Sequence, residues 1–223
     1  MKTEHLLIIR FSAMGDVAMT VPVIYSLAQQ YPQLRISVLS RPYAQAFFEN
    51  LAPNVDFMAA DLKHEYRKIR GLNKLYRRLT AKQFTAVADF HDTLRSKYLR
   101  MRFFMDRFKV AHIDKHRSEK RELIHHQNKV LKPIQSAFQN YADVLSELGY
   151  PIKLNFNSIF PTNNEAFTSL IPKIGNYKEN EKWIGLAPFA AHTGKIYPLT
   201  QMEQTLQGLL KIYPTARLFL FGG

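Results

Sequence analysis

Short apolar runs alternate with amphipathic stretches along the first 150 residues. The run His5-Leu-Leu-Ile-Ile-Arg10 is typical of a strand buried on both faces. Apolar residues recur at helical spacing from Val17 to Gln30, and Pro22 within that stretch predicts a helix that is kinked or begins late. The same alternation continues with strands at 35–40, 55–59, 85–90 and 109–113 and helices at 42–51, 72–79, 94–105 and 134–148. This order predicts a doubly wound parallel sheet of the Rossmann-like α/β class, with right-handed crossovers.

The pattern changes after Gly149, where Asn and Pro become frequent through residue 182. A strand at 183–188, a loop at 189–198, a helix at 202–212 and a strand at 217–221 follow. Such a βαβ unit opens a second doubly wound domain, but two strands leave most of a sheet unpaired. We therefore expect a complete domain at 1–150, a connector at 151–181 and the first part of a truncated second domain at 182–223.

The charge of the chain is concentrated in one stretch. The 223 residues include 31 Lys or Arg and 18 Asp or Glu, for a net charge of +13, and all of that excess lies in residues 63–132. Such a field attracts nucleic acid, an anionic membrane surface or a phosphorylated substrate, although solvated helix faces would also look like this. The aromatic residues among these charges are expected in the core rather than as base-stacking platforms: Tyr66, Tyr76, Tyr98, Phe103, Phe104 and Phe108.

Composition also limits the compartment and the chemistry. The chain has no Cys, which excludes disulfides and thiolate metal sites. No apolar run approaches the roughly 20 residues that span a bilayer, and the first run is too short for a signal-peptide core. We therefore expect a cytoplasmic protein. No set of three or four convergent His ligands is evident, so no metal site is predicted.

The loop Ser12-Ala-Met-Gly-Asp16-Val joins the first strand to the first helix. Ligands of open α/β sheets bind at the carboxyl ends of the strands, where this loop is expected to lie. Gly15 permits a tight turn, and Asp16 lies within reach of free helical N–H groups. Composition alone favours Asp16 as an N-cap or first-turn carboxylate that stabilises the helix by about 1 kcal/mol. A single Gly is not a dinucleotide fingerprint, which argues against NAD or FAD.

A second loop, at 187–198, carries Thr193, Gly194 and Lys195 between a predicted strand and helix. Small residues followed by a cation suit an anion site, and an ordinary surface loop fits equally well. It is not a P-loop, because Ile196 follows the Lys where Ser or Thr is required.

Four stretches together resemble a known family. They are 8–24 (Ile-Ile-Arg-Phe-Ser-Ala-Met-Gly-Asp-Val onward), 88–96 (Ala-Asp-Phe-His-Asp-Thr-Leu-Arg-Ser), 140–149 (Asn-Tyr-Ala-Asp-Val-Leu-Ser-Glu-Leu-Gly) and 185–198, with Lys195-Ile-Tyr-Pro198. Their order and spacing are similar to those of the heptosyltransferases, the family 9 glycosyltransferases of lipopolysaccharide inner-core synthesis. The resemblance implies a glycosyltransferase B fold, whose first domain binds the acceptor and whose second binds a nucleotide sugar such as ADP-heptose. It also implies inverting transfer without a metal or other cofactor.

The resemblance assigns roles to residues of both loops. Asp16 would be the general base, and Lys195 would stabilise the leaving diphosphate. The expected donor-binding residues are Thr193, Gly194, Lys195, Gly222 and Gly223. The expected acceptor-binding residues are Ser12, Met14, Gly15, His91, Asp92, Arg95, Lys115, Arg117, Lys120 and Arg121. The acceptor would be an anionic lipid-linked glycan, so the basic stretch is expected to contact the inner face of the cytoplasmic membrane, with no specific nucleic-acid binding.

The sequence also departs from the family pattern. Ala190 and Ala191 stand where some relatives have hydroxyl residues, with Thr193 near enough to substitute, and Tyr197 replaces the family's Trp. The printed sequence ends before the family's Asp-x-Gly-x-x-His segment. The alternative is therefore a non-catalytic fragment that binds an acceptor or a partner and transfers nothing.

Overall fold

The structure is a computed structural model that describes residues 4–124, 131–158, 174–190 and 192–222. The chain divides into two units, Met1–Ile159 and Phe160–Gly223. Residues 151–158, which fall in the expected connector, lie along the first unit. There Ile152 and Phe156 pack against its core, and the Asn155 backbone N–H donates to Ser26 Oγ at 2.9 Å.

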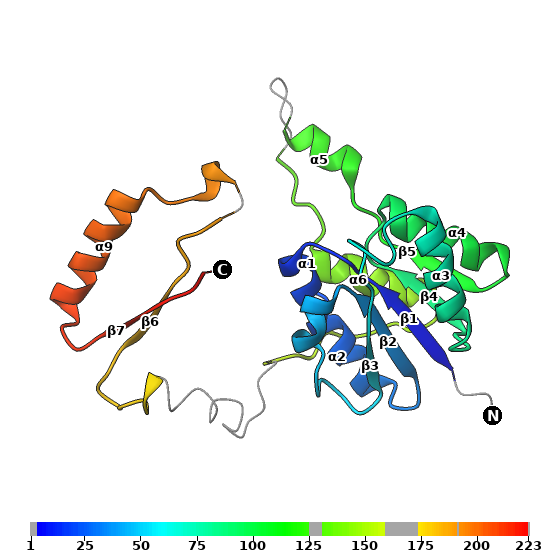
Figure 1. Cartoon of the computed structure of the whole chain (residues 1–223), viewed down its shortest axis with the longest axis horizontal. Helices are drawn as coiled ribbons and strands as arrows, with labels where there is room; N and C mark the ends of the chain where they lie inside the picture. Colours follow the sequence, from blue (N-terminus) through cyan, green and yellow to red (C-terminus); the bar gives the residue numbers. More distant parts are fainter. Residues whose placement is uncertain (1–3, 125–130, 159–173, 191, 223) are drawn as a thin grey trace. The chain divides into compact units, whose positions relative to one another are not determined.

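A five-stranded parallel sheet forms the centre of the first unit (Figure 1). Its strands are β1 (His5–Ile9), β2 (Arg35–Ser40), β3 (Val55–Ala59), β4 (Ala86–Asp89) and β5 (Lys109–His112), in the spatial order β3-β2-β1-β4-β5. The predicted doubly wound sheet is confirmed. The chain moves outward from β1 to β3, then returns to the other side of β1 with β4. The chain therefore leaves β1 toward one face of the sheet and β4 toward the other. Sheets of this kind bind ligands at the edge between two such loops.

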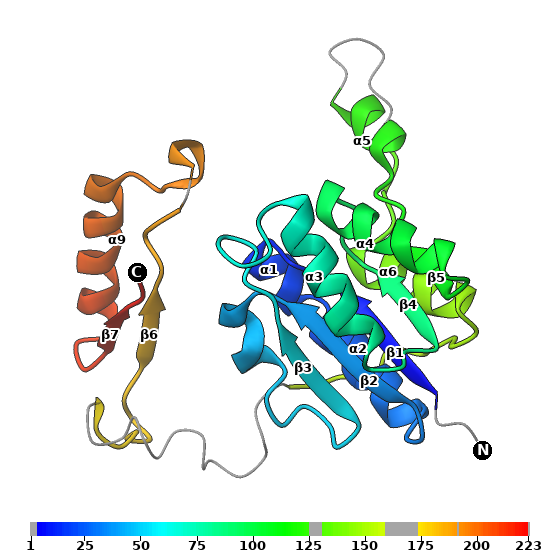
Figure 2. The ribbon, with the colours of Figure 1, turned by 45° about the vertical axis from the view of Figure 1, so that its right-hand side comes forward.

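Alternate residues of β1 supply two separate cores. Leu6 and Ile8 face helices α2 (Val21–Gln30) and α6 (Ala137–Glu147). Leu7 and Ile9 face helices α3 (Ile69–Thr80) and α4 (Leu94–Met105). Figure 2 shows α3 and α4 together over one face of the sheet. Helices on both faces explain why the strand reads as an uninterrupted apolar run.

Several helix boundaries differ from those predicted. The stretch 17–30 forms two helices, α1 (Met14–Ala18) and α2, because Pro22 suits only the first turn of a helix. Residues Pro42–Phe47 form the 3₁₀ helix η1 rather than a helix to 51. Helix α6 begins at Ala137, where Ser136 caps it by accepting from the Gln139 N–H at 3.2 Å. Helix α5 (Arg117–Leu123) was not predicted, because it buries no residue and so carries no apolar pattern.

Five of the six aromatic residues that were expected in the core do pack inside. Tyr66, Tyr76 and Phe103 are buried, and Tyr98 and Phe108 pack partly against the same core. The prediction is wrong for Phe104, which is exposed. Successive helical residues point about 100° apart, so when Phe103 faces the sheet Phe104 turns toward solvent.

The second unit contains the predicted βαβ arrangement. Strands β6 (Trp183–Leu186) and β7 (Arg217–Leu220) pair in parallel, and helix α9 (Leu199–Ile212) connects them. The short 3₁₀ helix η2 (Thr193–Lys195) lies in the loop between β6 and α9. No residue of α9 is buried. Within the described ranges of both units, no helix is long and apolar enough to cross a bilayer.

Candidate functional site

The loops after β1 and β4 contact each other at the carboxyl edge of the sheet. Ser12 Oγ lies 3.3 Å from His91 Nε2, and the other ring nitrogen of His91 lies 3.2 Å from Thr93 Oγ1. The Phe11 ring meets the His91 ring edge-on, with centroids 5.7 Å apart. Two loops about 80 residues apart in sequence thus contact each other at the topological switch point of the sheet, between β1 and β4.

Asp16 lies in the first turn of α1, beside this contact. Its Oδ2 accepts from the Ala13 backbone N–H at 3.1 Å and pairs with Arg10 Nη2 at 2.6 Å. Its side chain is 51% exposed, and Oδ1 accepts no hydrogen bond from the part of the chain that the structure describes. Asp16 therefore does stabilise the helix start, as composition suggested, and it also presents a free carboxylate oxygen to solvent.

Arg10 contacts both the loop after β1 and the loop after β4. It follows β1 directly and is buried, and its Nη1 donates to the Phe90 carbonyl at 2.6 Å, just after β4. Its guanidinium lies 6.0 Å from the centre of the Tyr141 ring, and its buried Nε has no hydrogen-bond partner among the residues that the structure describes. A buried guanidinium with an unsatisfied donor is costly, and the ion pair with Asp16 and the hydrogen bond to Phe90 offset part of that cost.

Tyr141 closes the other side of the Asp16 turn. This residue of α6 stacks on Phe90 with ring centroids 4.6 Å apart, and its hydroxyl donates to the Asp16 carbonyl at 3.4 Å. Burial raises the pKa of Tyr141, so it is a neutral hydrogen-bond donor at physiological pH. Three elements, β1, β4 and α6, therefore fix the position of Asp16.

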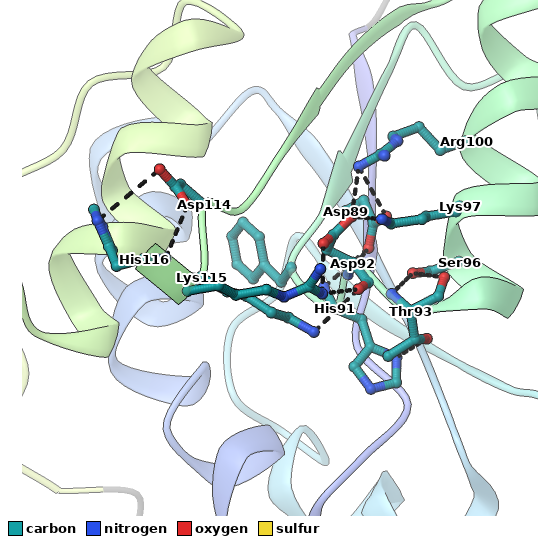
Figure 3. A network of polar contacts seen from close by, with 12 residues as sticks. Asp89, His91, Asp92, Thr93, Ser96, Lys97, Arg100, Asp114, Lys115 and His116 are labelled. Carbon is teal, nitrogen blue, oxygen red and sulfur yellow. Dashed lines mark hydrogen bonds and ion pairs between the residues drawn. The ribbon is translucent and has the colours of Figure 1, made fainter. Parts of the chain in front are cut away.

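A second cluster lies where β4 ends (Figure 3). Asp89 is fully buried, and its Oδ1 accepts from the backbone N–H groups of His91 and Asp92, both at 2.9 Å. Arg100 reaches from α4 to within 3.4 Å of both carboxylates. Asp92 adopts a left-handed backbone conformation with φ of 44°. Asp89 thus sets the tight turn that aims His91 and Asp92 at the carboxyl edge.

Asp92 is surrounded by cations. Lys97 lies 3.4 Å and Arg117 3.2 Å from its carboxylate, and Lys115 Nζ donates to its carbonyl at 3.0 Å. Burial alone would raise the pKa of Asp92, but Lys97, Arg100 and Lys115 outweigh it and lower the pKa. An ionised carboxylate held by this many cations is suited to positioning them, and less suited to taking a proton.

His91 and Lys115 have pKa values shifted in the same direction. Burial, followed by the nearby charges of Arg10 and Lys115, lowers the pKa of His91 to about 4. Burial also lowers the pKa of Lys115, although Asp92 opposes it. His91 is therefore neutral at physiological pH, with one ring nitrogen donating and the other accepting.

Two pockets open at this edge. The first, about 420 Å³, is lined by residues that follow β1, β2, β3 and β4 and by the start of α4: Phe11, Ser12, Arg41, Leu62, His91, Thr93, Leu94 and Arg95. The second, about 440 Å³, is lined by Asp92, His112, Ile113, Asp114, Lys115, Arg117 and Ser118. Within the described ranges, Arg41 Nε is buried without a hydrogen-bond partner and Arg95 makes no ion pair. Free guanidinium groups in a concave site suit a carboxylate or phosphate.

The structure brings most of the expected acceptor-side residues together. The linings of the two pockets include Ser12, His91, Asp92, Arg95, Lys115 and Arg117. Asp16 lines neither pocket and lies four residues after Ser12, paired with Arg10. Met14 and Gly15 are exposed on α1, in the same turn as Asp16. Lys120 and Arg121 are exposed on α5, and no described contact joins their side chains to this cluster.

Sequence reasoning missed five residues that organise this edge: Arg10, Arg41, Asp89, Arg100 and Tyr141. A signal existed for three of them, because Arg10, Arg41 and Asp89 each stand at or directly after the end of a predicted strand. Charged residues at carboxyl ends of parallel strands all meet at one edge. Arg100 and Tyr141 lie within amphipathic helices, and their spacing gave no such indication.

The expected donor-side residues lie in the second unit. Lys195 ends η2 with an exposed side chain, while its backbone N–H donates to the His192 carbonyl at 3.0 Å. Gly194 has open space where a side chain would be. A Cβ at Gly222 would lie 2.7 Å from the Phe189 ring, so Gly222 has a packing reason to be glycine. Gly223 lies outside the described residues.

No protein-family model and no curated protein matches the sequence. Several solved structures, however, are similar to the structure of this chain. A glycosyl transferase family 9 protein from Veillonella parvula superposes with a TM-score of 0.73 at 20% identity, over 100% of this chain and 64% of the other. The E. coli heptosyltransferase WaaC with ADP-2-deoxy-2-fluoro heptose gives 0.66 at 19%, over 98% and 69%. The E. coli ADP-heptose lps heptosyltransferase II gives 0.62 at 17%, over 98% and 64%.

These similarities confirm the expected likeness to family 9 glycosyltransferases at the level of the fold. The chain spans 64–69% of the length of these three proteins. At identities of 17–20% the shared fold does not by itself carry over a reaction or a substrate.

Proposed function

We propose that this chain carries the acceptor side of an inverting, metal-independent glycosyltransferase. The reaction would move heptose or a related sugar from a nucleotide sugar such as ADP-heptose to a lipopolysaccharide inner-core acceptor. The observation that carries the proposal is the free Oδ1 of Asp16, held by Arg10 and α1 at the point where the sheet reverses its winding. The similarity in fold to heptosyltransferases supports the choice of reaction.

Asp16 would act as the general base. Its Oδ1 takes the proton of the acceptor hydroxyl as the hydroxyl oxygen attacks the anomeric carbon of the donor sugar. The new glycosidic bond forms while the bond from that carbon to the diphosphate oxygen breaks, and the electron pair leaves with the nucleoside diphosphate. Attack opposite the leaving group inverts the anomeric centre. Arg10 keeps the carboxylate aimed and does not itself touch the acceptor.

Lys195 would stabilise the leaving group. Negative charge grows on the diphosphate as the bond breaks, and a cation next to the N–H groups of a short helix can offset it. Thr193 and Gly194 precede Lys195 in η2, where a hydroxyl and an open backbone can approach phosphate oxygens. This proposal uses the second unit only through this loop.

The first pocket would take an acidic group of the acceptor. Arg41 and Arg95 line it and form no ion pair with any described residue, while Ser12 and Thr93 add hydroxyl groups. Lys115 and Arg117 line the second pocket, where Asp92 already satisfies part of their charge. A glycan with several carboxylates or phosphates fits this division. Such an acceptor is lipid-linked, which favours a cytoplasmic protein that binds at the inner face of the cytoplasmic membrane.

The direct test is acceptor-dependent release of ADP. The purified 223-residue chain is incubated with ADP-heptose, with and without a deacylated inner-core acceptor, and the glycan product is examined by NMR. The proposal expects ADP release only when the acceptor is present, and a product of inverted anomeric configuration. Retained configuration would contradict the mechanism.

A second candidate is a module that binds acceptor but transfers nothing. It is favoured by the sparse burial in the second unit, where α9 buries no residue. In that case the acceptor binds to the chain, binding weakens when Arg41 and Arg95 are replaced by Gln, and no ADP is released. Acceptor-dependent release of ADP would exclude it.

A further inference from the structure

Helix α4 has apolar side chains on both of its faces. Its inward face is Ser96, Leu99 and Phe103, which are buried. On the outward face Leu94 is 87% exposed, Met101 49%, Phe104 72% and Met105 66%. Residues 94, 101 and 105 fall on one side of a helix, with Phe104 beside them. We call these four side chains the α4 ridge.

Cations border the α4 ridge. Arg95 and Arg102 lie on one side of it along the helix, and Lys97 and Arg100 lie on the other. Arg95 makes no ion pair in the described ranges, and the Lys97 side chain is partly exposed beside Asp92. An apolar strip edged by basic side chains is the pattern of helices that lie in a membrane interface.

The neighbouring helix α3 extends the same surface with charge. Its exposed side carries Arg70, Lys74 and Arg77. The two helices are joined through Asn73, which accepts from the Tyr98 hydroxyl at 2.7 Å and from Arg102. Neither α3 nor α4 contains an Asp or Glu, so the two helices contribute only positive charge to this surface, although Lys74 pairs with Glu65 at 2.7 Å. Figure 2 shows the two helices side by side on the same face of the sheet.

We propose that the α3–α4 surface docks on an anionic membrane. The α4 ridge enters the boundary between headgroups and acyl chains, and Arg70 and Arg77 contact the headgroup phosphates. Nucleic acid fits less well, because phosphates engage the cations but gain little from Leu94, Met101 and Met105. An anionic membrane is therefore favoured by the combination of an exposed apolar ridge with an excess of positive charge from Arg70, Arg77 and Arg95.

The position of the surface links it to the candidate site. Helix α4 begins at the first pocket, since Leu94 and Arg95 line that pocket. A membrane on the α3–α4 surface would place the pocket beside the headgroups, where a lipid-linked glycan is presented. This consequence rests on the proposed function, whereas the docking itself rests only on the surface.

The test is co-sedimentation of the full chain with vesicles that hold neither donor nor acceptor. Vesicles of phosphatidylcholine alone are compared with vesicles that also contain phosphatidylglycerol. We expect binding to the anionic vesicles and little to the neutral ones. The triple variant Met101→Gln/Phe104→Gln/Met105→Gln should bind at least ~10-fold more weakly, because it removes the apolar side chains that enter the interface. Gln keeps helix propensity close to that of Met, and circular dichroism checks the fold.

Two further variants make the result specific. Leu199→Gln/Ile212→Gln removes side chains that are 65% and 68% exposed at the two ends of α9, and it should bind like the wild type. Arg70→Gln/Arg77→Gln should weaken binding by about fivefold for each charge at low salt.

The proposal is overturned if the triple variant binds like the wild type, or if the α9 variant loses as much binding as the triple variant. It is also overturned if the wild type is a dimer that the triple variant dissociates, since a second copy would then cover the ridge. Because no sugar transfer is measured, this proposal and the glycosyltransferase proposal can each fail alone.

Discussion

The two units of the chain differ in how firmly they hold their candidate residues. In the first unit, β1 is fully buried, and Asp16 is fixed by contacts from Arg10, Ala13 and Tyr141. In the second, the residues of β6 and β7 are half-buried or exposed, and the Lys195 side chain has no partner among the described residues. The first unit is therefore organised before a ligand arrives, whereas Lys195 must lose side-chain freedom on binding.

The difference follows from the number of packed layers. The first sheet has helices on both faces and therefore two cores. In the described part of the second unit, two strands are connected by helix α9, which has no fully buried residue, so this part cannot offset the entropy of ordering a loop to the same extent. Rigid positioning of a catalytic group is thus expected from the first unit, and adaptable contact with a diphosphate from the second.

The largest expected difference between the two units is in the free energy of unfolding. Leu7→Ala in β1 removes a fully buried side chain and should lower the free energy of unfolding by 2–5 kcal/mol, in the range typical of Leu→Ala in a core. Leu218→Ala in β7 removes a half-buried side chain and should change the same transition by less than about 1 kcal/mol. Urea unfolding followed by far-UV circular dichroism measures both.

Equal losses in the two variants would contradict the contrast. Trp183 is the only Trp of the chain and lies in β6, so its fluorescence reports on the second unit. Its transition is expected at lower urea than the circular dichroism transition. Coincident transitions would indicate that the chain unfolds as one cooperative body.

A smaller effect concerns the pH dependence of the first unit. The folded pKa of His91 is about 4, below its unfolded value of 6.5. The unfolded state then binds the proton more readily, so stability is present above pH 6.5 and is lost as the pH falls toward 4. Between pH 7 and pH 5, His91 should account for about 1–2 kcal/mol of lost stability, allowing for solvent around the pocket.

His91→Gln should remove that part of the loss while His5, whose pKa burial also lowers, keeps its own contribution. The matched control is His64→Gln, because the His64 side chain is exposed on the surface beside Asp61. Urea unfolding of both variants at the two pH values gives the difference. If His91→Gln shows the same pH dependence as the wild type, His91 is not the buried neutral imidazole described here.

The smallest effect compares two helix starts. Ser136→Ala removes the side chain that accepts from Gln139 N–H at the start of α6, and should cost about 1 kcal/mol. Helix α9 begins after Pro198 without a side-chain cap, so Thr200→Ala should stay within about 0.5 kcal/mol of the wild type. Chemical unfolding curves distinguish the two. A neutral Ser136→Ala would mean that the N-terminus of α6 is not held by its cap.

Much of the fold was predictable because the parallel strands are short, mostly apolar stretches that alternate with amphipathic helices. The runs at 35–40 and 55–59 coincide with β2 and β3. Helix α5 gave no signal, since a helix without a buried face has no apolar period. Phe104 was misassigned because α4 is apolar on two faces, so its pattern does not say which aromatic residue turns inward.

Only part of the candidate site could be predicted from the sequence. His91 was a candidate because it follows a strand, whereas the site role of Asp16 came from the family resemblance, and the sheet order brings the two positions together. The role of Tyr141 could not be foreseen, because its contact with Asp16 joins positions 125 residues apart and depends on how α6 packs. Pairings of that kind come from tertiary packing rather than from local pattern.

The central claim is that Asp16 is the base at the reversal point of the sheet, and one matched pair of variants tests it directly. Asp16 pairs with Arg10 at 2.6 Å and is 51% exposed, while Asp56 pairs with Arg35 at 2.7 Å and is 52% exposed, in β3 and outside the site. In the acceptor-dependent assay of ADP release, Asp16→Asn should lower turnover at least ~10²-fold and Asp56→Asn should leave it unchanged, with both variants folded. Near-wild-type turnover of Asp16→Asn, or an equal loss in both variants, would contradict the assignment.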